Sequence, residues 1–239
     1  MAILASSLVD GFVKSNFMGQ GIVLVQLLGS VVMVAVAIGK WKSLASYAGA
    51  ARRFLRDFAT GNTVLEYYMR RRPNVRRGVE GIYKVTCERL LALLTPEVRS
   101  HLVGQQDDGA AALTAREIEL VRGTCEHMLD EEEILVGKGM GIIATIVALA
   151  PMLGLLGTVW GVLDAFAEMG AAGSANLATI APSISSALVT TVVGLLVAIP
   201  GTAIFTRLNA TIRSISADME GFADELVGRI ACEYHGKGA

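Results

Sequence analysis

The chain has 239 residues, 53 % of them hydrophobic, and a formal net charge of −1. Its three cysteines and three histidines are far apart and form no CxxC or ligand spacing, which excludes a disulfide framework and a metal site. The sequence shows no phosphate loop, nucleophile motif or paired pocket carboxylates, so we expect neither an enzyme nor a cofactor. The near-neutral charge argues neither for nor against nucleic acid, and we expect no nucleic-acid partner.

Three stretches contain no Asp, Glu, Lys or Arg, and they cover residues 15–39, 139–163 and 169–206. Each exceeds the roughly 20 apolar residues that cross about 30 Å of hydrocarbon. Buried helices of a soluble protein rarely run so far without a charge. We therefore predict an all-α polytopic membrane protein with three transmembrane helices. Asp10 precedes Lys14 ahead of the first span, which is not the pattern of a cleaved signal peptide.

Basic residues indicate the orientation of the spans in the bilayer. The positive-inside rule counts Lys and Arg near the span ends. Five such residues follow the first span, namely Lys40, Lys42, Arg52, Arg53 and Arg56, and Arg207 and Arg213 follow the third. The connection between the second and third spans has Asp164 and Glu168 but no basic residue. We expect a periplasmic N-terminus and a cytoplasmic C-terminus in the inner membrane of a bacterium.

These boundaries divide the chain into six segments. They are an N-terminal periplasmic segment with the first span (1–39), a cytoplasmic helical insertion (40–138), the second span (139–166), a periplasmic linker (167–179), the third span (180–206) and a cytoplasmic C-terminal helix (207–239). The second and third spans should extend into a cytoplasmic helical bundle. A turn is expected at 104–109, and the acidic run at 130–133 should be a solvated helix face, with an ion-exit role as the alternative.

The C-terminal helix has an apolar stripe that needs a partner. Its residues alternate steps of four and three: Leu208, Ile212, Ile215, Met219, Phe222 and Leu226. Either the insertion's helices or a neighbouring subunit could cover it.

Small residues mark the second span as a close-packing helix. Gly154, Gly157 and Gly161 share one face, where another helix backbone can approach closely, and Gly194 adds a small residue to the third span. Pro151 frees a backbone carbonyl, which neighbours or water must satisfy inside a membrane.

Hydroxyl groups follow one face of the third span. Ser183, Ser186 and Thr190 form a stripe that Gly194 continues, and a second, apolar face opposes it with Leu188, Val192, Leu195 and Ile199. Thr158 and Thr191 add hydroxyls at membrane depth. Such groups either line a narrow wet path or bond carbonyls of their own helix.

Two segments resemble a known family. The stretch LGLLGTVWGVLDAF at 153–166 and the stretch from Asn176 to Asn209, with its APSISSALVTT block, resemble the MotA/TolQ/ExbB proton channel family and are closest to TolQ and ExbB. The three expected spans also fit TolQ and ExbB, whereas MotA proteins have four.

The resemblance implies a homopentamer around a dimer of a single-span partner of the ExbD/TolR/MotB kind, whose transmembrane helix carries an ion-binding aspartate. It implies that the second and third spans line the pore and that Thr158 and Thr191 face that aspartate. It also implies an ion-driven motor of the cell envelope. A non-energised membrane scaffold that holds partner proteins is the rival hypothesis.

One residue departs from the family pattern. Where TolQ and ExbB usually have a membrane glutamate, this chain has Ser186, so its third span contains no acid. An ionisable side chain inside the bilayer is costly and is normally kept only for function. The pore would then depend on hydroxyls and on the partner's acid, and the transported ion could be H⁺ or Na⁺.

Overall fold

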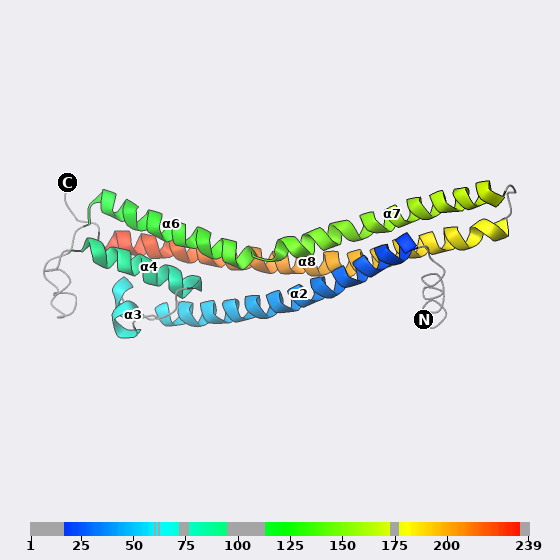
Figure 1. Ribbon diagram of the computed structural model, residues 1–239. Coiled ribbons are helices and arrows are strands. Elements are labelled where there is room, and N and C mark those ends of the chain that lie inside the picture. Colours follow the sequence, from blue (N-terminus) through cyan, green and yellow to red (C-terminus); the bar gives the residue numbers. More distant parts are fainter. Residues whose placement is uncertain are drawn as a thin grey trace. The chain divides into compact units, whose positions relative to one another are not determined.

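The computed structural model describes residues 17–59, 61, 63–71, 77–94, 113–172 and 177–234. The N-terminal segment before residue 17, expected to be periplasmic, and the turn expected at 104–109 lie outside these residues. Every regular element that the described residues form is an α-helix, which confirms the all-α prediction (Figure 1). The helices are α2 (Phe17–Phe58), α3 (Val64–Arg71), α4 (Gly78–Leu93), α6 (Ala115–Gly137), α7 (Met140–Ala172) and α8 (Leu177–Tyr234).

Three of these helices, α2, α7 and α8, are long and apolar enough to cross a membrane, as the charge-free runs predict. Each continues beyond the expected span. Helix α7 runs on to Ala172 and α8 begins at Leu177, so most of the linker expected at 167–179 is helical. Helix α8 continues without interruption from the third span to Tyr234, through Pro182 and Pro200.

The chain divides into two compact units, one of residues 1–41 and 139–209 and one of residues 42–138 and 210–239. The first contains the apolar parts of α2, α7 and α8. Its outward surface is apolar, as Leu28 is 59 % exposed, Leu155 63 % and Ile199 67 %. Such side chains require lipid or another membrane helix around them.

In the second unit, an aromatic cluster packs α2, α3 and α4 around the C-terminal part of α8. The ring centroid of Phe222 lies 5.5 Å from that of Phe54 and 5.4 Å from that of Phe58. Tyr83 joins the cluster, and its hydroxyl donates a hydrogen bond of 2.6 Å to the carbonyl oxygen of Val64. The apolar stripe of the C-terminal helix is therefore covered by helices of the same chain; within this unit Ile212, Ile215, Met219, Phe222 and Leu226 are all buried.

The acidic run at 130–133 does not form a uniformly solvated face. Glu132 is 2 % exposed, and the hydroxyl of Tyr47 on α2 donates a hydrogen bond to its carboxylate. The expectation of a solvated run is wrong at this residue, because a carboxylate can be buried where a donor satisfies it. Charge patterning along one helix does not reveal that donor.

Candidate functional site: the interface between α7 and α8

Gly154, Gly157 and Gly161 of α7 face the third span of the same chain. A Cβ atom added to Gly154 would lie 2.9 Å from the Cα atom of Thr191, closer than side chains tolerate. A Cβ atom added to Gly157 would overlap Thr190, and one added to Gly161 would overlap Ala187. The two helix backbones therefore approach as closely as glycine allows, as small-residue stripes permit in membranes.

Two threonines of α8 bond the α7 backbone at this contact. The Oγ1 atom of Thr191 donates to the carbonyl oxygen of Gly154 at 2.8 Å. The Oγ1 atom of Thr190 lies 2.7 Å from the carbonyl oxygen of Ala187 on its own helix and 3.3 Å from that of Gly154. Two hydroxyls thus converge on one carbonyl oxygen at the centre of the helix pair.

The other hydroxyls bond carbonyl oxygens of their own helices or a carboxylate. Thr158 Oγ1 donates to Leu155 at 2.7 Å, and Ser186 Oγ donates to Ser183 at 3.0 Å. Ser183 Oγ donates to Glu168 Oε2 at 2.8 Å, which joins the start of α8 to the C-terminal part of α7. Each of these hydroxyls donates its one hydrogen in these bonds, but its oxygen can still accept a hydrogen bond from water or a ligand.

Burial separates the five hydroxyl residues into two groups. Thr190 is 1 % exposed, Ser186 6 % and Ser183 9 %, so these three side chains lie in the interior of the folded chain. Thr158 and Thr191 are half-buried and reach the protein surface. The apolar face opposite the stripe is exposed, with Leu188 58 %, Val192 44 %, Leu195 43 % and Ile199 67 % accessible.

A small cavity lies in this interface toward the connection between α7 and α8. Its volume is about 10 Å³, near the minimum for one water molecule. Asp164, Ser186 and Thr190 contribute polar groups to its wall, and Gly19 brings in the first span. Asp164 is a site residue that was expected only to mark the orientation of the spans. It lies three residues after Gly161, so it continues the glycine stripe, and this spacing is the sequence signal for its position at the interface.

Gln26 is a second polar residue that the sequence analysis did not single out. It is 2 % exposed within α2, and its Nε2 atom donates a hydrogen bond of 3.0 Å to the carbonyl oxygen of Ala150. The amide also packs on Gly194, where an added Cβ atom would lie 2.8 Å from Nε2 and 2.6 Å from the Ala150 carbonyl oxygen. An amide inside an apolar run is the sequence signal for such a contact between spans.

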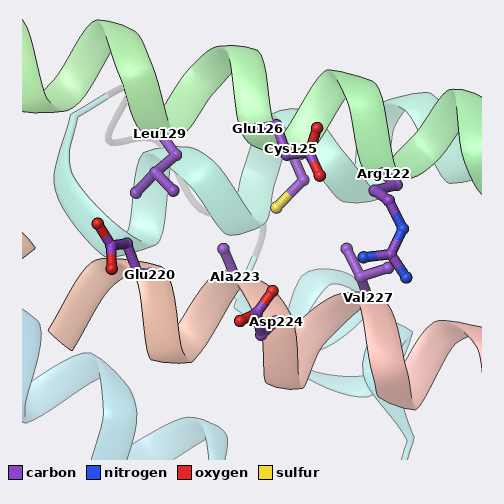
Figure 2. A pocket seen from close by; sticks show the side chains of 8 residues that line it. All are labelled: Arg122, Cys125, Glu126, Leu129, Glu220, Ala223, Asp224 and Val227. Carbon is purple, nitrogen blue, oxygen red and sulfur yellow. The ribbon is translucent and has the colours of Figure 1, made fainter. Parts of the chain in front are cut away.

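The second unit has a groove of about 220 Å³ between α6 and α8, shown in Figure 2. Its walls contain three carboxylates, one guanidinium and one thiol, whose sulfur points toward α8 (Figure 2). Burial raises the pKa of the Cys125 thiol, which keeps it protonated and unreactive. The lining residues are Arg122, Cys125, Glu126, Leu129, Glu220, Ala223, Asp224 and Val227.

No group of His, Cys, Asp and Glu among the described residues has the geometry of a metal site.

Three apolar helices with glycines and hydroxyls at the α7/α8 contact define an all-α, multi-pass membrane protein. Comparison with known families gives the more specific result. The MotA/TolQ/ExbB proton channel family matches residues 97–221, and the chain belongs to this family. This confirms the resemblance seen in the sequence and places the chain in a family of channel proteins.

Individual relatives support the same assignment. The chain is 27 % identical to the Tol-Pal system protein TolQ of Haemophilus influenzae over 231 residues, which cover 95 % of each chain. It is 37 % identical to the biopolymer transport protein ExbB of Xanthomonas campestris over 108 residues, 45 % of this chain and 43 % of that one. It is 35 % identical to TolQ of Pseudomonas aeruginosa over 97 residues, 41 % of this chain and 42 % of that one. The similarity to TolQ of H. influenzae thus extends through all three apolar helices.

Proposed function

We propose that this chain is the channel and stator subunit of an ion-driven motor in the bacterial inner membrane. Five copies would surround two copies of a single-span partner protein that carries a membrane aspartate. The assembly would use the proton-motive force, or a Na⁺ gradient, to do mechanical work on the cell envelope. The names of its relatives favour a Tol-Pal or biopolymer-transport process.

The observation that carries the proposal is the different burial of the hydroxyl residues. A group that faces a partner in a central pore must be reachable from outside its own protomer. Thr158 and Thr191 are half-buried and meet this condition, whereas Ser183, Ser186 and Thr190 are enclosed by α7 and α8. This difference supports Thr158 and Thr191, the two residues implied by the family resemblance, as the hydroxyls that a partner helix would reach.

The close α7/α8 contact suits a stator, because it would hold the two pore-lining helices of each subunit rigidly together. In the proposed cycle, an ion reaches the partner's aspartate and neutralises it, which weakens its attraction to the hydroxyls of Thr158 and Thr191. The partner then turns by one step relative to the pentamer. One charge that crosses about 100 mV releases roughly 2.3 kcal/mol, several times the thermal energy, so a single ion can bias that step.

Orientation follows from the basic residues. With Lys40 and Arg207 on the cytoplasmic side, the second unit would lie in the cytoplasm and the ends of α7 and α8 near Ala172 and Leu177 would face the periplasm. Ions driven by the membrane potential would then enter at this end of the α7/α8 pair.

Native mass spectrometry of the detergent-purified chain tests the assembly, alone and after co-expression with a single-span protein of the same genome that has a membrane aspartate. We expect a pentamer that takes up two partner copies. A monomer or dimer that does not bind such a partner would contradict the motor hypothesis and favour the scaffold hypothesis.

Ion flux into liposomes containing the complex tests the role of the two threonines. The double variant Thr158→Ala, Thr191→Ala should abolish flux without changing the stoichiometry. Thr202→Ala is the matched control, because the Thr202 hydroxyl bonds its own helix at Ala198, 2.8 Å away, on the same α8. Full flux in the double variant would show that these hydroxyls are not part of the ion path.

A further inference from the structure

The cavity at the outer part of the α7/α8 interface places a carboxylate beside the serine that departs from the family pattern. Asp164 on α7 and Ser186 on α8 line the same space of about 10 Å³. The apolar part of α8 contains no acidic residue, but Asp164 on α7 lines the same cavity as Ser186. The acidic group is thus present on the neighbouring helix rather than missing from the site.

The surroundings of Asp164 suit a group that exchanges a cation. The residue is half-buried and lines the cavity. The cavity has room for about one water molecule, and its walls include the hydroxyl residues Ser186 and Thr190. Carboxylate and hydroxyl oxygens are ligands for Na⁺ and also form hydrogen-bonded paths for protons.

Its depth in the membrane also fits an entry site. About 20 helical residues cross the hydrocarbon, so counting from Met140 places Asp164 near the outer boundary rather than the midplane. Gly154, where Thr190 and Thr191 converge, lies ten residues earlier, about 15 Å further in along the helix. The free-energy cost of a charged carboxylate is lower at the boundary of the hydrocarbon than at its midplane. A carboxylate at the boundary can still pass a cation to groups deeper in the membrane.

Glu168 is the other carboxylate on this part of α7, one turn further out. Its side chain is exposed and accepts the hydroxyl hydrogen bond of Ser183. It does not line the cavity. Glu168 can therefore be compared with Asp164, because both acids lie on α7 but only Asp164 lines the cavity.

We propose that Asp164 receives the transported cation at the outer mouth of the α7/α8 interface and passes it toward Thr190 and Thr191. Asp164 supplies from α7 the carboxylate that Ser186 does not supply from α8. This inference rests on the proposed function, since it requires that the chain conducts ions.

The test is ion flux under an imposed membrane potential, in liposomes that contain the chain with its single-span partner. Flux is measured as lumen acidification in Na⁺-free buffer and as uptake of radiolabelled Na⁺. Asp164→Asn should lower one of the two fluxes by about 100-fold, the lower end of what a positioned proton-transfer group contributes. The control Glu168→Gln should stay near wild type. The affected assay identifies the ion.

An exchange variant keeps the test decisive if Asp164→Asn fails to assemble. The double substitution Asp164→Ser, Ser186→Asp moves the acid to α8 and conserves composition and total side-chain volume. Recovery of flux well above that of Asp164→Ser alone supports the inference. An assembled exchange variant without flux, or an assembled Asp164→Asn variant with wild-type flux, overturns it.

The two proposals fail in different ways. If Asp164→Asn conducts normally while the Thr158 and Thr191 double variant does not, the inference about Asp164 fails and the motor stands. If the wild-type chain forms no pentamer and conducts no ion with its partner, the proposed function fails and the inference fails with it.

Discussion

Gln26 Nε2 donates a hydrogen bond of 3.0 Å to the carbonyl oxygen of Ala150, and this bond ties the first span to the second. The same amide lies against Gly194 of the third span, so three helices meet at one point. A polar side chain that is 2 % exposed in an apolar segment fixes the rotation of α2 relative to its neighbours. The contact is possible only because residue 194 has no side chain.

Gly194→Ala should therefore destabilise the membrane unit. The new Cβ atom would lie 2.6 Å from the Ala150 carbonyl oxygen and 2.8 Å from Gln26 Nε2, so the helices must separate. We expect a loss of about 1–3 kcal/mol, the usual cost of overpacking, seen as a lower Tm in detergent. Gly141→Ala is the control, because a Cβ atom there meets nothing within 4 Å. Equal Tm values for the two variants would contradict the contact.

Tyr47→Phe should destabilise the second unit. It removes the hydroxyl that donates to the carboxylate of Glu132, which is 2 % exposed, and leaves that acceptor without this donor. We expect a cost of about 1–3 kcal/mol in chemical denaturation. The double variant Tyr47→Phe, Glu132→Leu should regain most of the loss, because replacing both partners by apolar groups removes the unsatisfied acceptor. If the variant Tyr47→Phe alone is as stable as the wild type, the hydrogen bond contributes nothing to the stability of this unit.

The three cysteines should differ in reactivity. Burial raises the pKa of the Cys87 thiol to about 12 and also raises the pKa of Cys125, whereas Cys232 is exposed. Since the thiolate is the reactive form, a maleimide at neutral pH should label Cys232 quickly and the other two only after denaturation. Mass spectrometry counts the labels. Rapid labelling of a Cys232→Ser variant in its folded state would contradict the buried positions.

The start of α6 should be sensitive to acid. Thr114 donates through its backbone N–H and its hydroxyl to Glu117, and these bonds lower the pKa of the Glu117 carboxyl. A lowered folded-state pKa adds stability above the unfolded value of about 4.3, and this stability is lost as the pH falls through the folded value. The Tm difference between wild type and Glu117→Ala should therefore be largest near neutral pH and shrink in acid. A pH-independent difference would argue against the charged capping bond.

Much of this protein follows from one-dimensional patterns. Runs without charge determine the three spans, because a charged side chain inside hydrocarbon is costly. The spacing of Gly154, Gly157 and Gly161 determines that α7 packs closely on another helix, because three- and four-residue steps return to the same helix face. The GTVWG and APSISSALVTT segments give the family.

Only the tertiary structure decided which neighbour meets each face. The stripe that includes Phe222 could be covered by its own chain or by another subunit, and the aromatic cluster with Phe54 and Phe58 shows that its own chain covers it. Glu132 belongs to an acidic run, yet Tyr47, 85 residues away in sequence, allows it to be buried. Asp164 and Ser186 line one cavity although they lie on different helices. Periodicity reports the direction of a side chain from its own helix axis, whereas burial and partners depend on residues that the folded chain brings from far away in sequence.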